Sequence, residues 1–142
     1  MSNLFTRLVA IFFYSDLHAT RFTLSIAEAI WALTLLWDGN TFDRPTYMQM
    51  SQVMSENAWG FVFLISSVTQ ASILIIGDYH SRFATYFAGW NCALWLYVTI
   101  SMYTSVTPPP AAISGEAALA LAAGWIWIRS GHIINGRRSS DN

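Results

Sequence analysis

The chain has 142 residues, the length of one domain, of which 54% are hydrophobic, 15% aromatic and only 11% charged. This composition is too apolar for a soluble fold with a solvated surface, so it indicates an integral membrane protein. The formal net charge is -1, all seven cationic residues are arginines, and no basic arm is present, which excludes nucleic acid as a partner.

Residues 1–15 are predicted to form an interfacial helix that lies on the membrane surface. Apolar residues recur there at helical spacing around Arg7, but at about 1.5 Å per residue the segment is too short to cross a bilayer. A cleaved signal peptide is the alternative. Asp16, His18 and Arg21 argue against it, because they stand where small cleavage-site residues are expected and a full-length span follows.

Residues 16–76 are predicted to form a first helical hairpin whose spans cover about 18–37 and 58–76. Ser15 or Asp16 is the expected N-cap of the first span, because both side chains can accept from free backbone N–H groups. The interval between the spans, residues 38–57, is the outer loop of this hairpin.

The outer loop is expected to contain a short surface helix. Pro45 stands at a suitable helix start, and Tyr47, Met50 and Met54 follow on one face. We expect this face to pack on the protein's own helices, and a partner-binding surface is the alternative, since methionine side chains adapt to irregular partners.

Residues 77–130 are predicted to form a second hairpin, with spans at about 79–102 and 111–129. The connection before it, 77–82, is long enough only for a tight turn, and the prolines at 108–110 keep the next turn free of helix. The fourth span is rich in alanine and glycine, which allow helices to approach closely in lipid. Residues 131–142 form a polar tail, which is expected to be cytoplasmic.

The predicted fold class is therefore an all-α membrane protein with four transmembrane helices. Four spans place both termini and the 77–82 turn on one side, and that side holds six arginines against Arg44 alone on the other. By the positive-inside rule both termini are expected to be cytoplasmic. The six arginines are Arg7, Arg21, Arg82, Arg129, Arg137 and Arg138.

The beginnings of the first and third spans echo each other. Each has Asp-x-His followed two or three residues later by Arg-Phe, and a shift of 61 residues also aligns several apolar positions. The echo indicates a duplicated hairpin, in which case the two hairpins superpose by rotation about an axis along the membrane normal. Chance similarity between apolar sequences is the alternative. The motif comprises Asp16, His18, Arg21, Asp78, His80 and Arg82.

This motif is interpreted as a cytoplasmic interface motif rather than a metal site. Two carboxylates and three imidazoles, with His132 included, have the right chemistry for zinc, but Asp-x-His at a helix start points its side chains in different directions. We expect the aspartates to cap helices, the histidines to sit among lipid headgroups and the arginines to extend to lipid phosphates.

Three polar residues, Glu28, Gln70 and Asn91, fall inside the predicted spans at depths of about 13, 10 and 15 Å. A carboxylate there costs about 2.5–3.5 kcal/mol, so Glu28 is expected to face the interior with hydrogen-bond partners or to be protonated. Ser66 and Thr69 are expected to share the polar face of Gln70.

Two interpretations of this intramembrane polar layer remain. A structural network in which Glu28 bonds to Gln70 or Asn91 is favoured over a proton or ion relay, because no second mid-membrane acid or base completes a relay. Glu116, about one turn into the fourth span, is expected to act electrostatically at the helix N-terminus.

No phosphate-binding loop, nucleophile elbow, cysteine cluster or calcium loop is present, so no enzymatic activity and no cofactor are expected. Cys92 is interpreted as a small packing residue.

In build, the chain resembles the small multi-span inner-membrane proteins of tailed bacteriophages, including holin-like and superinfection-exclusion proteins, through its Trp-rich spans, short turns and basic tail. The resemblance implies a non-enzymatic protein that acts on the host membrane or on a membrane partner, as a homo-oligomer or with another membrane protein. The alternative is a small transporter or accessory subunit in which Glu28, Gln70 and Asn91 line a route for an ion or proton.

Overall fold

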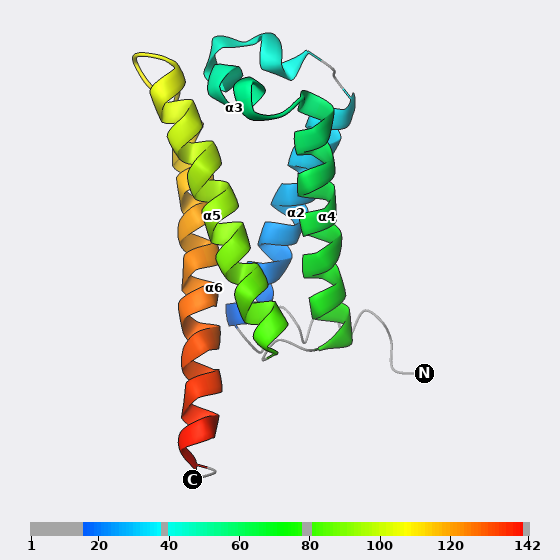
Figure 1. The fold of residues 1–142 in the computed structure, drawn as a ribbon, viewed down its shortest axis with the longest axis vertical. Helices are drawn as coiled ribbons and strands as arrows, with labels where there is room; N and C mark the ends of the chain where they lie inside the picture. The colour runs from blue at the N-terminus through cyan, green and yellow to red at the C-terminus, as the bar shows by residue number, and fades with distance from the viewer. Residues whose placement is uncertain (1–15, 38–39, 78–80, 141–142) are drawn as a thin grey trace.

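The computed structural model describes residues 16–37, 40–77 and 81–140, and side chains from Leu17 to Gly131 within those ranges. The described chain is all-α and contains no strand. Four long helices run up and down side by side, and a cap of short helices covers one end (Figure 1). The long helices are α2 (Asp16–Trp37), α4 (Glu56–Ile76), α5 (Arg82–Ser105) and α6 (Ile113–Ser140). The predicted interfacial helix, residues 1–15, lies outside the described residues.

Serine side chains cap the starts of helices α4 and α5. Ser55 Oγ accepts from the backbone N–H of Ala58 at 3.4 Å, and Ser81 Oγ accepts from that of Ala84 at 3.0 Å. Each serine thereby satisfies one of the free N–H groups of a helix's first turn. The prediction that Asp78 caps this helix is therefore wrong, because the N-cap of α5 is Ser81. Helix α4 ends at Gly77, whose φ of 79° is the left-handed conformation that glycine adopts without a steric penalty.

The cap consists of η1 (Thr41–Asp43), η2 (Pro45–Tyr47) and α3 (Met48–Val53), and Pro45 begins a helical turn as predicted. Two contacts tie the cap to α4. The Glu56 carboxylate accepts from the backbone N–H groups of Thr41 at 2.9 Å and Phe42 at 3.4 Å, and the Trp59 indole donates to Met50 O at 3.0 Å. Met50 is fully buried. The outer loop therefore packs on its own helices, in agreement with the favoured interpretation.

The helices pair as two hairpins, α2 with α4 and α5 with α6, and α6 also contacts α2. Ser25 and Ser67 join the first pair: Ser25 Oγ donates to Ser67 O at 3.0 Å, and Ser67 Oγ donates to Ser25 O at 2.8 Å. In the second pair, a side chain added at Gly124 would lie 3.3 Å from Cys92 Sγ. The small residues of α6 thus permit the close approach that the sequence indicated.

Aromatic rings fill the centre of the bundle next to the cap. Trp31 contacts Phe63 at 5.4 Å and Trp95 at 5.9 Å between ring centroids, and Phe63 contacts Trp95 at 5.3 Å. Trp59 stacks on Tyr97 at 5.4 Å. These rings come from α2, α4 and α5, so they hold both hairpins together.

Among the described residues, two helices rather than four meet the length and apolarity expected of a membrane span. They are Leu17–Trp37 and Glu56–Ile76, with mean hydropathies of 1.2 and 1.9. Helix α5 is long enough, but its tryptophan, tyrosine, threonine and serine residues lower its mean hydropathy. Glycine and serine residues and the basic end lower the mean hydropathy of α6. Helix α6 also continues to Ser140, beyond the predicted end at Arg129.

The burial pattern does not follow the 61-residue echo. That shift pairs buried Arg21 with exposed Arg82 and buried Leu35 with exposed Leu96. A shift of 63 residues instead pairs buried with buried side chains, among them Glu28 with Asn91 and Leu35 with Val98. The inward faces of α2 and α5 thus correspond in a register two residues away from that of the sequence echo.

Candidate functional site: buried polar layers and an outer pocket

The first polar layer surrounds Arg21, which is fully buried between three helices. Its Nη1 donates to Gln70 Oε1 at 3.0 Å, and its Nη2 donates to the backbone oxygen of Ala84 at 3.1 Å. We call Arg21, Gln70 and Ala84 O the Arg21 layer. The expectation that Arg21 extends to lipid phosphates is therefore wrong, because its guanidinium turns inward and connects α2 to α4 and α5.

The second layer consists of Glu28, Asn91 and Trp95, and we call it the Glu28 layer. All three side chains are fully buried. The Trp95 indole is a polar neighbour of the Glu28 carboxyl, but the pair falls short of hydrogen-bond geometry. Several polar atoms of this layer have no hydrogen-bond partner among the described residues: both Glu28 oxygens, both polar atoms of Asn91 and the indole nitrogen of Trp95. Buried polar groups are ordinarily paired, so this concentration of unpaired groups marks a candidate site.

The structure partly supports the predicted polar layer and corrects its bonding. Glu28, Gln70, Asn91 and Ser66 are all buried, as expected. The predicted hydrogen bonds from Glu28 to Gln70 or Asn91 are not formed among the described residues, because Gln70 Oε1 accepts from Arg21 instead and both Glu28 oxygens are unpaired.

Thr69 does not belong to the polar face of α4. Its hydroxyl donates to Ile65 O within its own helix at 2.8 Å, and its side chain is half-buried. The inward serine that sequence reasoning missed is Ser67. It lies three residues before Gln70 on the same helical face, whereas Thr69 lies about 100° away from Gln70, and this spacing could have identified it.

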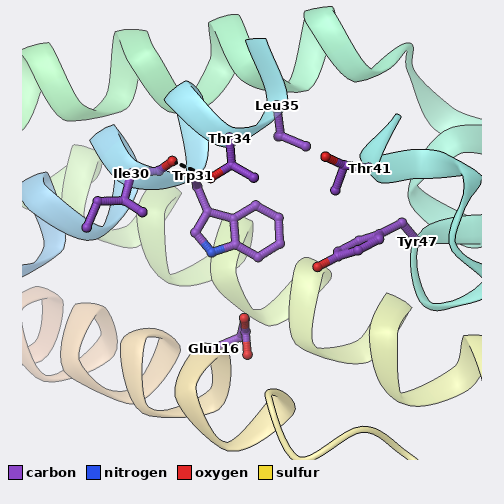
Figure 2. A pocket seen from close by; sticks show the side chains of 7 residues that line it. All are labelled: Ile30, Trp31, Thr34, Leu35, Thr41, Tyr47 and Glu116. Carbon is purple, nitrogen blue, oxygen red and sulfur yellow. Dashed lines mark hydrogen bonds between the residues drawn. The ribbon is translucent and has the colours of Figure 1, made fainter. Parts of the chain in front are cut away.

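An outer pocket of about 190 Å³ lies between α2, the cap and the start of α6. Figure 2 shows the Glu116 carboxylate pointing toward the Trp31 ring, with the Tyr47 hydroxyl directed into the same space. Glu116 is only 8% exposed, and its Oε2 has no hydrogen-bond partner among the described residues. The lining residues are Ile30, Trp31, Thr34, Leu35, Thr41, Tyr47 and Glu116.

Tyr47 keeps its proton in this pocket. Burial raises the pKa of its phenol above the ordinary value of 10.0, and the negative charge of Glu116 raises it further, while Arg44 opposes the shift. The hydroxyl is therefore available as a donor near neutral pH. Glu116 itself lies in the first turn of α6, as predicted, where a carboxylate interacts favourably with the helix dipole.

Of the six residues of the interface motif, the structure describes the side chains of His18, Arg21 and Arg82. His18 is half-buried and Arg82 is exposed. Asp16 is the first residue of α2, but its side chain and that of His132 lie outside the described part, as do Asp78 and His80. Among the residues described, no group of three or more His, Cys, Asp or Glu side chains could hold a metal ion.

Comparison with known proteins gives no relative from which a role could be transferred. No family model, no curated protein and no solved structure matches this chain. The functional argument therefore depends on the chemistry of the buried layers and of the outer pocket. Together they contain two buried carboxyl groups, one buried guanidinium and several unpaired hydrogen-bonding groups, which can bind or transfer a proton or accommodate a cation.

Proposed function

We propose that this protein is an integral membrane protein whose four long helices all cross the bilayer, and that its interior carries a proton past Glu28. It is thus a small transporter or an accessory subunit of one. In this proposal both termini are cytoplasmic, which the excess of arginines on their side supports, and the membrane is a bacterial inner membrane, as the resemblance to bacteriophage proteins implies. The observation that carries the proposal is Glu28, a fully buried carboxyl group without a hydrogen-bond partner among the described residues.

The apolar exterior supports four spans rather than two. In the most apolar stretch of α2 only 33% of the residues are buried, and in that of α4 only 44%, so most of each helix faces outward. Large apolar side chains are exposed on α5 and α6 as well, although these helices are less apolar overall. Hydrocarbon, rather than water, suits such a surface. The exposed side chains include Ile26, Ile30, Leu33, Phe61, Ile65, Val68, Phe83, Trp90, Ile100, Leu121, Trp125 and Ile128.

The bonding of Glu28 favours a proton site over a structural network. A structural role requires Gln70 or Asn91 to hold the carboxyl group, and neither bond is formed among the described residues. Arg21 lies two turns away on α2, about 10.5 Å along the axis. At an effective dielectric constant of about 20, the attraction at that distance is only about 1.6 kcal/mol, which is small beside the several kcal/mol of desolvating a charge. Binding of a proton makes Glu28 neutral and avoids that cost, so we infer that the carboxyl group takes up a proton readily.

The polar groups follow one another along the bundle, which is what a proton route requires. Glu116 and Tyr47 lie at the cap, and Trp31 links them to Trp95 through a ring contact at 5.9 Å. Trp95 borders Glu28, and the Arg21 layer lies two turns of α2 further toward the start of that helix. The groups are spaced too widely for direct transfer, so water molecules are needed between them.

Proton flux into vesicles tests this proposal. The purified protein is reconstituted with a pH-sensitive dye inside, and a potassium gradient with valinomycin sets the membrane potential. We expect Glu28→Gln to abolish the flux, because it keeps the size and hydrogen-bonding capacity but removes the ionisable group. Glu28→Asp is expected to retain part of it. Asp43→Asn, which removes an exposed carboxylate from the cap, is the matched control and is expected to behave as wild type.

Equal flux in wild type and Glu28→Gln would contradict the proposal, as would the absence of flux in the wild type. The same vesicles distinguish the role implied by the resemblance to bacteriophage proteins. Release of a large trapped dye that does not depend on Glu28 would favour a protein that permeabilises the membrane.

A further inference from the structure

The outer pocket combines one carboxylate with two aromatic walls. Glu116 stands opposite Trp31 and beside Tyr47, and the two rings meet edge to face at 6.0 Å with an interplanar angle of 78° (Figure 2). Leu35 and Ile30 complete an apolar boundary. Trp31 comes from α2, Tyr47 from η2 and Glu116 from α6. These elements are far apart in the sequence, so the pocket depends on the packed bundle.

No cationic side chain is among the described residues that line this pocket, so the charge of the Glu116 carboxylate is not balanced there. Glu116 is more than nine-tenths buried, its carboxyl group points toward Trp31 in Figure 2, and its Oε2 has no hydrogen-bond partner among the described residues. The Tyr47 phenol is held in its neutral form, so it adds no second negative charge. A buried carboxylate with an adjoining cavity favours a positively charged occupant.

We propose that the outer pocket binds a small organic ammonium ion. Trp and Tyr rings attract cations through their faces, and a carboxylate adds the opposite charge. A metal ion fits less well, because calcium and magnesium require several oxygen ligands and this pocket offers one carboxylate among rings and aliphatic side chains. The volume of about 190 Å³ is below the range of about 300–1,000 Å³ for drug-sized ligands, which restricts the occupant to a group of a few carbon atoms.

Two sources could supply this chemistry: a free alkylammonium ion, or the headgroup of a phospholipid with a choline or ethanolamine group. The pocket is lined by residues of the cap and of two long helices. The cap covers one end of the bundle (Figure 1), which is where the proposed spans meet the membrane surface. Either source presents the same cation to Glu116. The pocket shares Glu116, Tyr47 and Trp31 with the proposed proton route, but binding of a cation there is measured without proton movement at Glu28, so the two proposals can fail separately.

Titration with tetramethylammonium chloride tests the proposal, with tryptophan fluorescence of the purified protein in a maltoside detergent as the signal and sodium chloride as the reference. We expect a saturable change with tetramethylammonium only. Glu116→Gln is expected to weaken binding at least tenfold, and Tyr47→Leu to weaken it more than Tyr47→Phe, because phenylalanine keeps the ring face. The matched control Asp43→Asn removes an exposed carboxylate from the same cap and is expected to leave binding unchanged.

The source of the cation is distinguished in lipid nanodiscs. If a phospholipid headgroup occupies the pocket, replacing part of the phosphatidylglycerol by phosphatidylcholine weakens tetramethylammonium binding at least tenfold; if the occupant is a free ion, affinity does not change. The proposal is overturned if tetramethylammonium gives no saturable signal beyond sodium, or if Glu116→Gln, with helicity intact by circular dichroism, binds as wild type. An equal loss of tetramethylammonium binding in Tyr47→Leu and Tyr47→Phe would also overturn it. This comparison of the two Tyr47 variants provides a second test if Glu116→Gln does not fold.

Discussion

At the scale of single residues, the two arginines of the repeated Arg-Phe motif have opposite environments. Arg21 is fully buried and donates to Gln70 and to the backbone of Ala84, whereas Arg82 is exposed in the first turn of α5. A guanidinium is less strongly hydrated than an ammonium group and always charged, so it can be buried where several acceptors converge. The same dipeptide therefore has two different roles, which depend on the neighbouring helices.

This difference predicts unequal effects of the same substitution. Arg21→Ala is expected to destabilise the protein by about 1–3 kcal/mol for each acceptor left without its donor. Arg82→Ala, the matched control, is expected to change the free energy of unfolding by no more than about 0.5 kcal/mol. Reversible unfolding in mixed detergent measures both. Equal effects of the two substitutions would show that Arg21 is not held by the bonds described.

At the scale of the elements, helix α2 closely approaches α4 at Gly60. A Cβ atom added there would lie 2.7 Å from Leu36 Cγ and 2.8 Å from Leu36 Cδ2, closer than atoms can pack without movement. Gly115, in the first turn of α6, has no atom within 4 Å of the corresponding position. The two glycines thus separate the steric requirement of helix pairing from the general effect of glycine in a helix.

Gly60→Ala is expected to destabilise the first hairpin by about 1–3 kcal/mol, the usual cost of overpacking. Gly115→Ala is expected to be neutral or to stabilise its helix by about 0.5–1 kcal/mol, because alanine loses less conformational entropy than glycine. The same unfolding measurement compares them. If Gly60→Ala were as stable as Gly115→Ala, Leu36 would move aside at no cost in free energy. Pairing of α2 with α4 would then not require glycine at position 60.

At the scale of the whole molecule, apolar side chains lie both in the core and on the exterior of the bundle. The exterior carries large apolar side chains on all four long helices, while Arg21, Glu28, Gln70 and Asn91 are fully buried. In the bilayer that we propose, lipid provides no hydrophobic driving force between helices, so the hairpins depend on small-residue packing and on polar contacts such as Ser25–Ser67.

Four spans and two spans make different predictions for topology. Reporter fusions in the 77–82 turn and at Pro108–Pro110 are expected to label opposite sides of the membrane, with the C-terminus on the side of 77–82. The reason is that α5 is long enough to cross and exposes apolar side chains such as Trp90 and Ile100. Labelling of both turns on the same side would limit the protein to the two spans α2 and α4.

The sequence by itself determined the all-α class, the approximate extents of the long helices and the burial of Glu28, Gln70, Ser66 and Asn91. These features are local. Long apolar runs interrupted by turn residues define helices, and a strongly polar side chain within such a run is driven to the interior. The burial of Met50 was equally accessible, because helical spacing placed it on the inward face of the cap.

Only the tertiary structure decided which buried groups meet. Each residue turns a helix by about 100°, so choosing Thr69 instead of Ser67, two positions earlier, selects a different face of α4. The rotation of one helix against another is not contained in either sequence segment. The pairing of Arg21 with Gln70, the unpaired state of Glu28 and the pocket beneath the cap each join helices distant along the chain. Their geometry follows from how the ridges of three or four helices pack together, which no single periodicity specifies.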